Sequence, residues 1–398
     1  MKKTNNSYSI PGFLASAASA GLKKNGGLDL SLIFSQRKAV AAGLFTTNKV
    51  KAAPVLLSQK RIKNGFLRAI IANAGCANAC TGSKGLNDAV QTANIVAKGL
   101  GIDPEETAVA STGVIGAYLP LNLIKKAVPG LISSLSPTGF NSVAEALMTT
   151  DSFPKTSYFE GTVGGHPFHL LGIAKGAGMI MPNMATMLSF LLTDIYIDPQ
   201  TLLPIFQSTV ESTFNRITVD GETSTNDTVI IMANGFAGNS RLNASDIKEF
   251  KKGLREVMGE LAYMIAKDGE GATKVVIIEV KGAATKRDAN LAARTVANSP
   301  LVKTAIFGED PNWGRIIAAL GKSGIKMEEN KVQIWINDVK VTEGGLMTSE
   351  KKEKEAALKM KDERITINIH LHQGNQTDRF TTCDLTYDYI KINAAYRS

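Results

Sequence analysis

The chain has 398 residues, of which 44% are hydrophobic and 20% charged, and its formal net charge is +9. This composition is typical of a folded globular protein and excludes intrinsic disorder. The length exceeds the roughly 250–300 residues at which a single hydrophobic core stops growing, so we expect two lobes. Basic residues are interleaved with acidic ones, as in Glu350–Glu355, which disfavours nucleic-acid binding. The excess positive charge favours acidic metabolites at most.

Cysteine content, histidine content and hydropathy exclude further classes. Three cysteines are too few for a disulfide framework, and the four histidines have no further ligand at metal-binding spacing, so we expect no metal. No apolar run reaches the ~18–20 residues of a membrane span. The segment 1–20 resembles a signal peptide only weakly, because polar residues and Pro11 interrupt it. We therefore expect a cytoplasmic protein that does not associate with membranes.

Strands and helices mix along the chain without strict alternation, which predicts an α+β layered architecture. In the first half, the expected strands are 13–20, 28–35, 39–46, 68–72, 107–111 and 168–174. The expected helices are 87–100, 121–128, which would end at Pro129-Gly130, and 141–149.

The second half shows the same mixture. Its expected strands are 186–197, 227–233, 274–281, 305–307, 332–336 and 365–372. Its expected helices are 204–213, with Pro204 in the first turn, 245–267, 287–297, 313–320 and 351–361.

The stretch 175–190 carries the strongest functional signal. It begins with the Lys-Gly-Ala-Gly loop at Lys175, passes Pro182, and enters an apolar strand at Thr186. A threonine where a flexible loop meets a rigid strand is well placed to act as a nucleophile. The same pattern also suits an ordinary loop-to-strand junction, so it needs support from elsewhere in the chain.

Four polar clusters supply that support, although each alone would suit a turn or a helix cap. They are 111–116 (Ser-Thr-Gly-Val-Ile-Gly), 148–151 (Met-Thr-Thr-Asp), 219–228 and 267–273 (Lys-Asp-Gly-Glu-Gly-Ala-Thr). Two phosphate-loop patterns fail because Ile316 and Met181 occupy required glycine positions. A cysteine acyltransferase built on Cys76 and Cys80 is disfavoured, because two small buried side chains in a tight loop explain them more simply.

Together with 310–315 (Asp-Pro-Asn-Trp-Gly-Arg) and the C-terminal 392–398, the clusters resemble the ornithine acetyltransferase family, also called glutamate N-acetyltransferase. The resemblance covers nearly the whole chain, and its most specific part is Met-Ala-Thr-Met-Leu at 184–188 behind the Lys-Gly-x-Gly loop. It implies a layered α/β sandwich of the self-processing ornithine acetyltransferase and aminopeptidase type. It also implies autocatalytic cleavage between Ala185 and Thr186, giving an α chain, 1–185, and a β chain, 186–398, in an α₂β₂ heterotetramer.

The resemblance implies a multifunctional acyltransferase of arginine biosynthesis. Thr186 would accept the acetyl group of N2-acetylornithine and pass it to glutamate. The new α-amine of Thr186, with an ordinary pKa of ~7.7–8.0, would serve as its base. No cofactor is implied, although acetyl-CoA is a candidate second acetyl donor.

Residue roles follow from the same resemblance, position by position. Thr112 and Gly113 match the oxyanion hole. The substrate-contacting positions are Thr149 or Thr150, Lys175, Thr186, Glu270, Asn393 and Ser398. We expect Lys175 to meet a substrate carboxylate, whereas Glu270 would hold an ammonium group or tune the amine of Thr186.

Two other functions remain open at this point. One is a self-processed amidase or aminopeptidase of the same fold, in which water replaces glutamate as acceptor. The other is a non-catalytic binder of small acidic metabolites, which fits the basic charge and the polar loops.

Overall fold

The computed structural model describes residues 8–181 and 187–395, which form two compact units. Unit 1 takes the described residues within Met1–Gly176, Pro182–Asn215 and Thr223–Ile265. Unit 2 takes those within Ala177–Met181, Arg216–Glu222 and Ala266–Ser398. Two lobes were expected, but each unit draws residues from both sides of the Ala185–Thr186 bond, so the units are not the two chains that cleavage would give.

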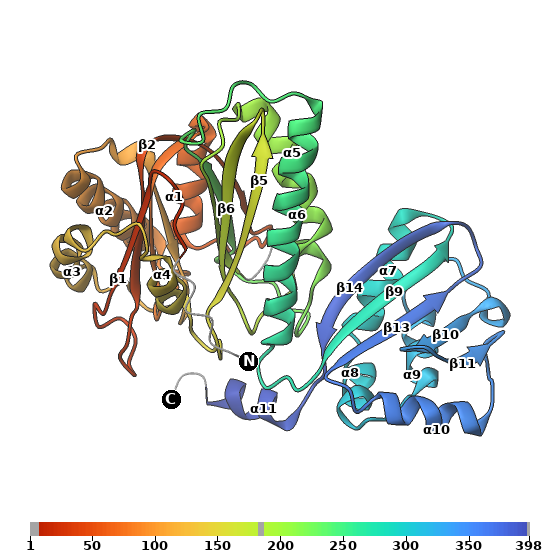
Figure 1. The fold of residues 1–398 in the computed structure, drawn as a ribbon. Coiled ribbons are helices and arrows are strands. Elements are labelled where there is room, and N and C mark those ends of the chain that lie inside the picture. The colour runs from red at the N-terminus through yellow and green to blue at the C-terminus, as the bar shows by residue number, and fades with distance from the viewer. Residues whose placement is uncertain (1–7, 182–186, 396–398) are drawn as a thin grey trace. The chain divides into compact units, whose positions relative to one another are not determined.

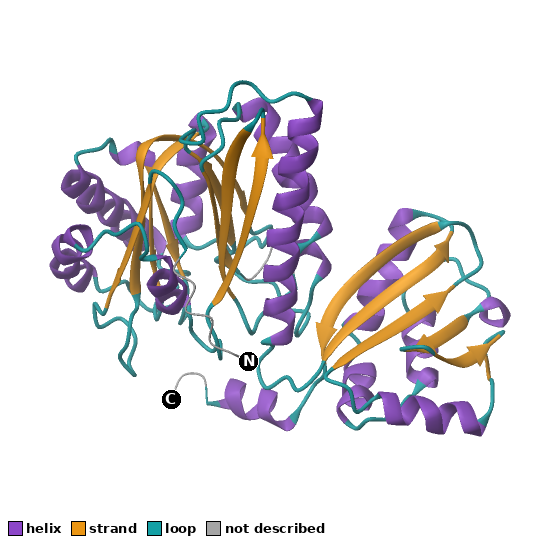
Figure 2. Ribbon diagram, viewed as in Figure 1, coloured by secondary structure: helices purple, strands orange, loops and turns teal. Residues whose placement is uncertain are grey.

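Unit 1 is a sandwich of strands flanked by helices (Figures 1 and 2). The order of its eight-stranded sheet is β4-β3-β2-β8-β7-β6-β5, with β1 paired to β2. The strands are β1 (Phe13–Ala18), β2 (Leu30–Phe45), β3 (Phe66–Asn73), β4 (Thr107–Ser111), β5 (Lys155–Val163), β6 (His166–Lys175), β7 (Leu188–Thr193) and β8 (Thr228–Ala233). The helices are α1 (Ala53–Arg61), α2 (Gly82–Leu100), α3 (Leu121–Ser133), α4 (Phe140–Leu147), α5 (Pro199–Ser212) and α6 (Ala244–Lys267).

The long strand β2 connects two layers of strands, one with β3 and β4 and the other with β8, β7, β6 and β5. It pairs with β3 mainly through its first part and with β8 through its last part, and the register of the β2–β3 pair shifts between Phe34 and Ala39. Strands commonly pass from one layer to another at such irregularities. This explains why the two strands expected at 28–35 and 39–46 are one continuous strand.

The side chains of β2 alternate between two hydrophobic clusters, as the period of a strand requires. Ile33 joins the cluster between the strand layers, together with Ile70, Leu171 and Phe190. Leu32 points the other way, into a cluster that also contains residues of α1, α2 and α3. The sheet is therefore buried on both faces, which is why a strand such as β7 is apolar almost throughout.

Helix α6 confirms the predicted three- and four-residue spacing of apolar side chains. Phe250, Leu254, Val257 and Leu261 are fully buried. A Cβ atom at Gly172 of β6 would lie 2.6 Å from side-chain atoms of both Val257 and Leu261. The helix therefore packs directly against the strand that ends at Lys175.

Unit 2 contains a six-stranded sheet in the order β12-β11-β10-β13-β9-β14. The strands are β9 (Val275–Ala283), β10 (Gln333–Ile336), β11 (Val339–Glu343), β12 (Leu346–Met347), β13 (Arg364–His370) and β14 (Gln376–Cys383). The helices are α7 (Lys286–Ala297), α8 (Pro300–Phe307), α9 (Trp313–Gly321), α10 (Glu350–Lys359) and α11 (Tyr387–Ala394). One hydrophobic cluster joins Val276, Ile278 and Val280 of β9 to apolar residues of α7, α8, α9 and α10.

The predicted α+β architecture is confirmed, whereas the strand expected at 305–307 is wrong. Those residues are the end of α8, which begins with Pro300 in its first turn. Val302, Ala305 and Ile306 are buried on one side of this helix. Three apolar residues are too few to distinguish a helix from a strand by period alone.

Two predicted helix boundaries, both placed at prolines, are also wrong. Helix α3 continues through Pro129, and Pro204 lies inside α5, whose first turn instead contains Pro199. An internal proline removes one hydrogen bond from a helix. In α3 the burial of Ile124, Val128 and Leu131 stabilises the helix on both sides of that gap.

Candidate active site

Of the predicted site residues, Ala185, Thr186 and Ser398 lie outside the described residues. The others belong to two groups, one in each unit. Thr112, Gly113, Thr149, Thr150 and Lys175 belong to unit 1. Glu270 and Asn393 belong to unit 2.

The first group starts where β4 ends. β3 and β4 are parallel, so their last residues, Asn73 and Ser111, lie side by side. The Ser111 hydroxyl donates to Asn73 Oδ1 at 2.6 Å, and the Thr112 N–H donates to the Asn73 carbonyl at 2.9 Å. Because the backbone donor of Thr112 is already used, its hydroxyl is the donor that it can offer to a ligand.

The backbone at Gly113 tolerates no side chain. Its φ is +130°, and a Cβ atom would lie 2.3 Å from the Gly75 carbonyl carbon and 2.6 Å from the Cys76 nitrogen. Within the described part of the chain, the Gly113 N–H has no backbone acceptor. A free N–H next to a threonine hydroxyl is the type of donor pair that stabilises an oxyanion.

Asn226 holds the segment before Thr112 in place. Its side-chain amide donates to the carbonyls of Ala77 at 2.6 Å and Ser111 at 2.8 Å. The side chain is buried, so these bonds replace those that water would make. The polar cluster 219–228 therefore contributes to this part of the site through a structural amide.

Lys175, the last residue of β6, brings the separate segments of unit 1 together. Its Nζ donates to Thr149 Oγ1 at 2.9 Å, and Thr112 Oγ1 lies at 3.5 Å. The residue is only 6% exposed. Thr112 and Thr149 lie 63 and 26 residues before Lys175 in the sequence, and both hydroxyl groups contact its ammonium group.

Beneath Lys175 lies a buried ion pair that the sequence analysis did not identify. Asp151 and Lys155 have no side-chain exposure, and Lys155 Nζ lies 2.7 Å from Asp151 Oδ1. The same carboxylate accepts from the N–H groups of Gly176 at 2.7 Å and Thr149 at 3.0 Å, and its Oδ2 lies 3.7 Å from Lys175 Nζ. The sequence signals were the presence of Asp151 in the polar cluster 148–151 and of a lysine four residues after it.

The charge state of Asp151 is well defined. Burial by itself would raise the pKa of this carboxyl group. The positive charges of Lys175 and Lys155, together with the hydrogen bonds from Lys155 and the Thr149 N–H, outweigh burial and hold the pKa well below its usual range. Asp151 is therefore an anion at any physiological pH.

In unit 2, Glu270 is the central residue of the second group. It is 8% exposed, and its Oε2 accepts from the Asn393 side-chain amide at 2.8 Å. Its own N–H donates to the Ala177 carbonyl at 2.9 Å. A Cβ atom at Gly178 would lie 2.3 Å from the carboxyl carbon of Glu270, so a glycine there lets the carboxylate approach the loop closely.

Asp220 fixes the same loop and was not predicted as a site residue. Its carboxylate accepts from the N–H groups of Met179 at 2.6 Å and Ile180 at 2.9 Å. Met179 has a φ of +57°, which is uncommon for a side chain of this kind. The Tyr389 hydroxyl lies 3.4 Å from Asp220, and burial followed by the charges of Asp220 and Glu270 raises the pKa of Tyr389.

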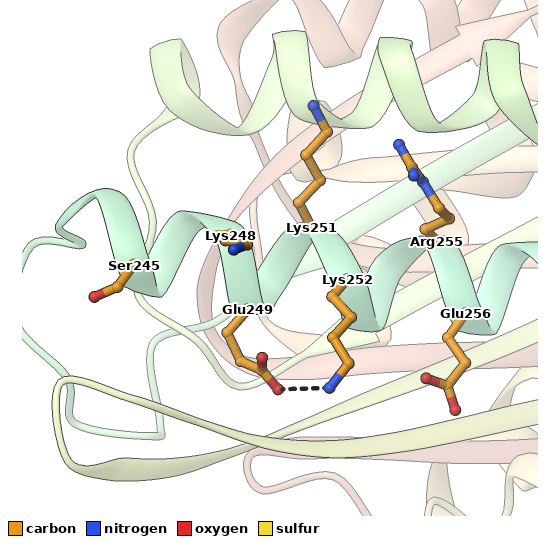
Figure 3. Close-up of a pocket in the computed structure, with 7 residues that line it drawn as sticks. All are labelled: Ser245, Lys248, Glu249, Lys251, Lys252, Arg255 and Glu256. Atoms are coloured by element: carbon orange, nitrogen blue, oxygen red, sulfur yellow. Dashed lines mark ion pairs between the residues drawn. The ribbon is translucent and has the colours of Figure 1, made fainter.

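The surface of unit 1 also has a hollow of about 640 Å³ along α6 (Figure 3). Its lining residues are Ser245, Lys248, Glu249, Lys251, Lys252, Arg255 and Glu256. The first turn of α6 is bonded to the β5–β6 turn, since Asp246 accepts from the Gly164 N–H at 2.8 Å. That turn is at the opposite end of β6 from Lys175, so the hollow is separate from the candidate active site.

The described residues contain neither a candidate metal site nor a membrane-spanning helix. No group of three or more His, Cys, Asp or Glu side chains within residues 8–181 and 187–395 is arranged to hold a metal ion. None of the helices in these ranges is long and apolar enough to cross a membrane.

Within the described residues, the unpaired N–H of Gly113, the hydroxyl of Thr112 and the buried Lys175 suit acyl transfer involving a charged substrate. Comparison with known proteins identifies the family of the chain. The ArgJ family profile matches residues 14–398. The arginine biosynthesis bifunctional protein ArgJ of Geobacter sulfurreducens is 49% identical over 391 residues, covering 98% of this chain and 100% of the relative. The protein of the same description from Desulfotalea psychrophila is 47% identical, with the same coverage of both chains.

A solved structure supports the same relationship. The crystal structure of the arginine biosynthesis bifunctional protein ArgJ from Bacillus halodurans is 44% identical and has a TM-score of 0.51. The match covers 53% of this chain and 100% of the solved chain. The chain belongs to the ArgJ family. This membership confirms the resemblance predicted from the polar clusters, and the protein is an acyltransferase of arginine biosynthesis.

Proposed function

We propose that this protein transfers the acetyl group of N2-acetylornithine to glutamate through an acetyl ester on Thr186. The observation that carries the proposal is the convergence of Thr112, Thr149 and Lys175 on one buried ammonium group. This convergence supports a role for Lys175 as the cation that binds a substrate carboxylate, with Thr112 as an oxyanion donor beside it. Family membership supports the same chemistry.

The proposed reaction starts with a self-processing step. The Thr186 hydroxyl attacks the Ala185 carbonyl, and hydrolysis of the resulting ester yields chains 1–185 and 186–398. The α-amine that this step creates on Thr186 then acts as the base for its own hydroxyl.

The contacts among the residues of unit 1 support the following roles in substrate binding. The hydroxyl of Thr112 and the N–H of Gly113 stabilise the oxyanion of the tetrahedral intermediate. Lys175 binds a substrate carboxylate. Thr149 or Thr150 contacts the substrate, and the Thr149 hydroxyl also accepts a hydrogen bond from Lys175.

Residues of unit 2 and the C-terminus complete the proposal. Glu270 binds an ammonium group, either that of ornithine or the α-amine of Thr186, and Asn393 holds its carboxylate. Ser398 contacts the substrate from the C-terminus. No bound cofactor is needed, and acetyl-CoA serves as a second acetyl donor for glutamate. The enzyme acts in the cytoplasm as an α₂β₂ heterotetramer of its two chains.

Mass spectrometry and enzyme assays test this function together. The purified protein is expected to contain a fragment whose N-terminus is Thr186, and Thr186→Ala is expected to remain a single inactive chain. Incubation with N2-acetylornithine alone is expected to add one acetyl group to the 186–398 chain. An uncleaved wild-type protein that still transfers acetyl groups would refute the mechanism.

The amidase alternative differs in the acceptor. Measurement of N-acetylglutamate and free acetate in the same reaction separates the two activities. Acetyl transfer predicts that glutamate suppresses acetate release in proportion to the N-acetylglutamate formed. Acetate release that is independent of glutamate would instead identify a hydrolase.

A further inference from the structure

We propose that Lys155, acting through Asp151, determines the preference of the site for a substrate carboxylate. The role of Lys155 is to neutralise Asp151, so that the charge of Lys175 remains available to the substrate. This inference rests on the proposed function, in which Lys175 binds that carboxylate. Lys155 is a positioning residue, because its side chain is fully buried and its charge reaches the substrate site through Asp151.

The distances distinguish the two lysines around Asp151. Lys155 Nζ lies 2.7 Å from Asp151 Oδ1, which is a direct charge-assisted hydrogen bond. Lys175 Nζ lies 3.7 Å from Asp151 Oδ2, beyond hydrogen-bond distance. The ammonium group of Lys175 instead donates to the Thr149 hydroxyl at 2.9 Å. Asp151 is thus paired with Lys155, and Lys175 keeps its charge for another partner.

The charge balance leads to the same conclusion. Lys155, Lys175 and Asp151 carry a net charge of +1, and the side chains of Asp151 and Lys155 have no exposure. Lys23 and Asp29, which interact with each other beside this group, have opposite charges and leave this balance unchanged. A buried excess charge is unfavourable unless a partner neutralises it. A carboxylate bound at Lys175 brings the cluster to neutrality, whereas a neutral amide of the same shape leaves it charged.

Another nearby cation does not replace Lys155. Lys23 influences this region electrostatically, but its Nζ donates to the carbonyls of Leu28 at 2.6 Å and Ala146 at 3.2 Å. Without Lys155, the remaining cation within 4 Å of Asp151 among the described residues is Lys175. The aspartate would then draw Lys175 into a direct pair and remove its charge from the substrate site.

The test compares N2-acetylornithine with its carboxamide analogue, which lacks the carboxylate. We define the carboxylate preference as the ratio of kcat/KM for the two donors, measured with glutamate as acceptor on the purified, self-processed protein. Lys155→Met is expected to lower this ratio by about tenfold or more, because truncating one member of a buried pair redirects the charge of the other. A purely structural role would lower kcat/KM equally for both donors and leave the ratio unchanged.

The double variant D151N/K155M provides the matched control. It removes both members of the pair, which buried sites tolerate better than the loss of one member. Lys175 is then unpaired again, so the ratio is expected to return to within about threefold of the wild-type ratio. If K155M is too unstable to purify, D151N/K155M still decides the matter, since loss of the preference in the double variant would overturn the proposal.

The outcomes separate this inference from the proposed function. A wild-type protein that transfers acetyl and prefers the carboxylate, together with an unchanged ratio in K155M, overturns the role of Lys155 alone. A wild-type protein without acetyl transfer overturns the proposed function, and this inference with it. Lys155→Arg, which keeps the positive charge, is expected to retain the wild-type ratio, and a drop as large as that of K155M would contradict the charge argument.

Discussion

Two buried acids, Asp151 in unit 1 and Glu270 in unit 2, are held in opposite ways. Asp151 is bonded to Lys155, lies 3.7 Å from Lys175 and accepts from two backbone N–H groups. Glu270 accepts from the neutral amide of Asn393, and no ion pair joins it to a cation among the described residues. The first carboxylate is therefore neutralised within the protein, whereas the second retains a negative charge that can bind an ammonium group.

A glycine in each unit shows a similar difference. A side chain at Gly113 would meet the backbone of Gly75 and Cys76, which cannot move independently of the fold. A side chain at Gly178 would meet the carboxylate of Glu270, which can rotate away. We conclude that the group in unit 1 is rigid and that the group in unit 2 can adjust, and four variants test this difference.

The largest effect is expected for Gly113→Ala. The methyl group must displace backbone atoms at 2.3 and 2.6 Å, so the candidate oxyanion donor moves. We expect kcat for acetyl transfer to fall by at least about 100-fold, which is the cost of losing one such donor. Gly116→Ala is the control, because Gly116 has a φ of +85° but no atom within 4 Å of its Cβ position. A similar loss of kcat in both variants would show that strain in the loop, rather than the position of the donor, explains the effect.

Asp151→Asn is expected to reduce the free energy of unfolding by about 3–5 kcal/mol, because it leaves two lysines without their buried acid. Urea denaturation of the full chain measures this change. Asp338→Asn is the matched control, since the side chains of Asp338 and its partner Lys359 are 74% and 43% exposed and such pairs contribute about 0–1 kcal/mol. Equal losses in the two variants would contradict the distinction between a neutralised buried acid and a surface pair.

The pH dependence of the Asp151 variant has a definite sign. The folded state holds the pKa of Asp151 below its usual value, so the carboxylate stabilises the protein above the unfolded pKa of about 3.9. That contribution is lost as the pH falls below this value towards the folded pKa. The difference in stability between wild type and Asp151→Asn should therefore shrink in acid, and a difference that stays constant down to about pH 2 would contradict it.

Gly178→Ala tests whether the unit 2 part can adjust. We expect kcat/KM to fall by about tenfold as the Glu270 carboxylate moves, while stability changes by less than about 1 kcal/mol because the displaced atoms belong to a side chain. Gly321→Ala, at a position with no atom within 4 Å, is the control. A destabilisation of Gly178→Ala as large as that of Gly113→Ala would show that both parts are equally rigid.

The smallest effect is expected for Asn393→Ala. It removes one hydrogen bond to Glu270 from a residue on the exposed helix α11, so we expect a change of about 0.5–1.5 kcal/mol in substrate binding. This corresponds to a rise in KM of about two- to tenfold for N2-acetylornithine, with little change in stability. An unchanged KM would indicate that the backbone alone positions Glu270.

Long-period patterns in the sequence predicted much of the fold. Helix α6 and strands β6 and β9 were expected near their observed positions, because their apolar side chains recur over many residues. The short apolar segment of α8 and the helices that contain Pro129 and Pro204 were misjudged, since tertiary packing outweighs local propensity there. Strands β5 and β14 were not expected. The sequence of β5 contains many polar residues, and its pairing with β6 stabilises it as a strand.

The sequence by itself determined the family, the α+β class and the candidate residues, because the clusters around Thr112, Thr149 and Lys175 are local and distinctive. Only the tertiary structure decided which donors, acceptors and charges of these residues are already used within the protein. It showed that Asn73 uses the Thr112 N–H, that Asp151 and Lys155 form a buried pair, and that Asp220 holds the loop at Met179. Hydrogen bonds and charge pairs depend on distances between segments far apart in the chain, and those distances arise only when the strands assemble into layers.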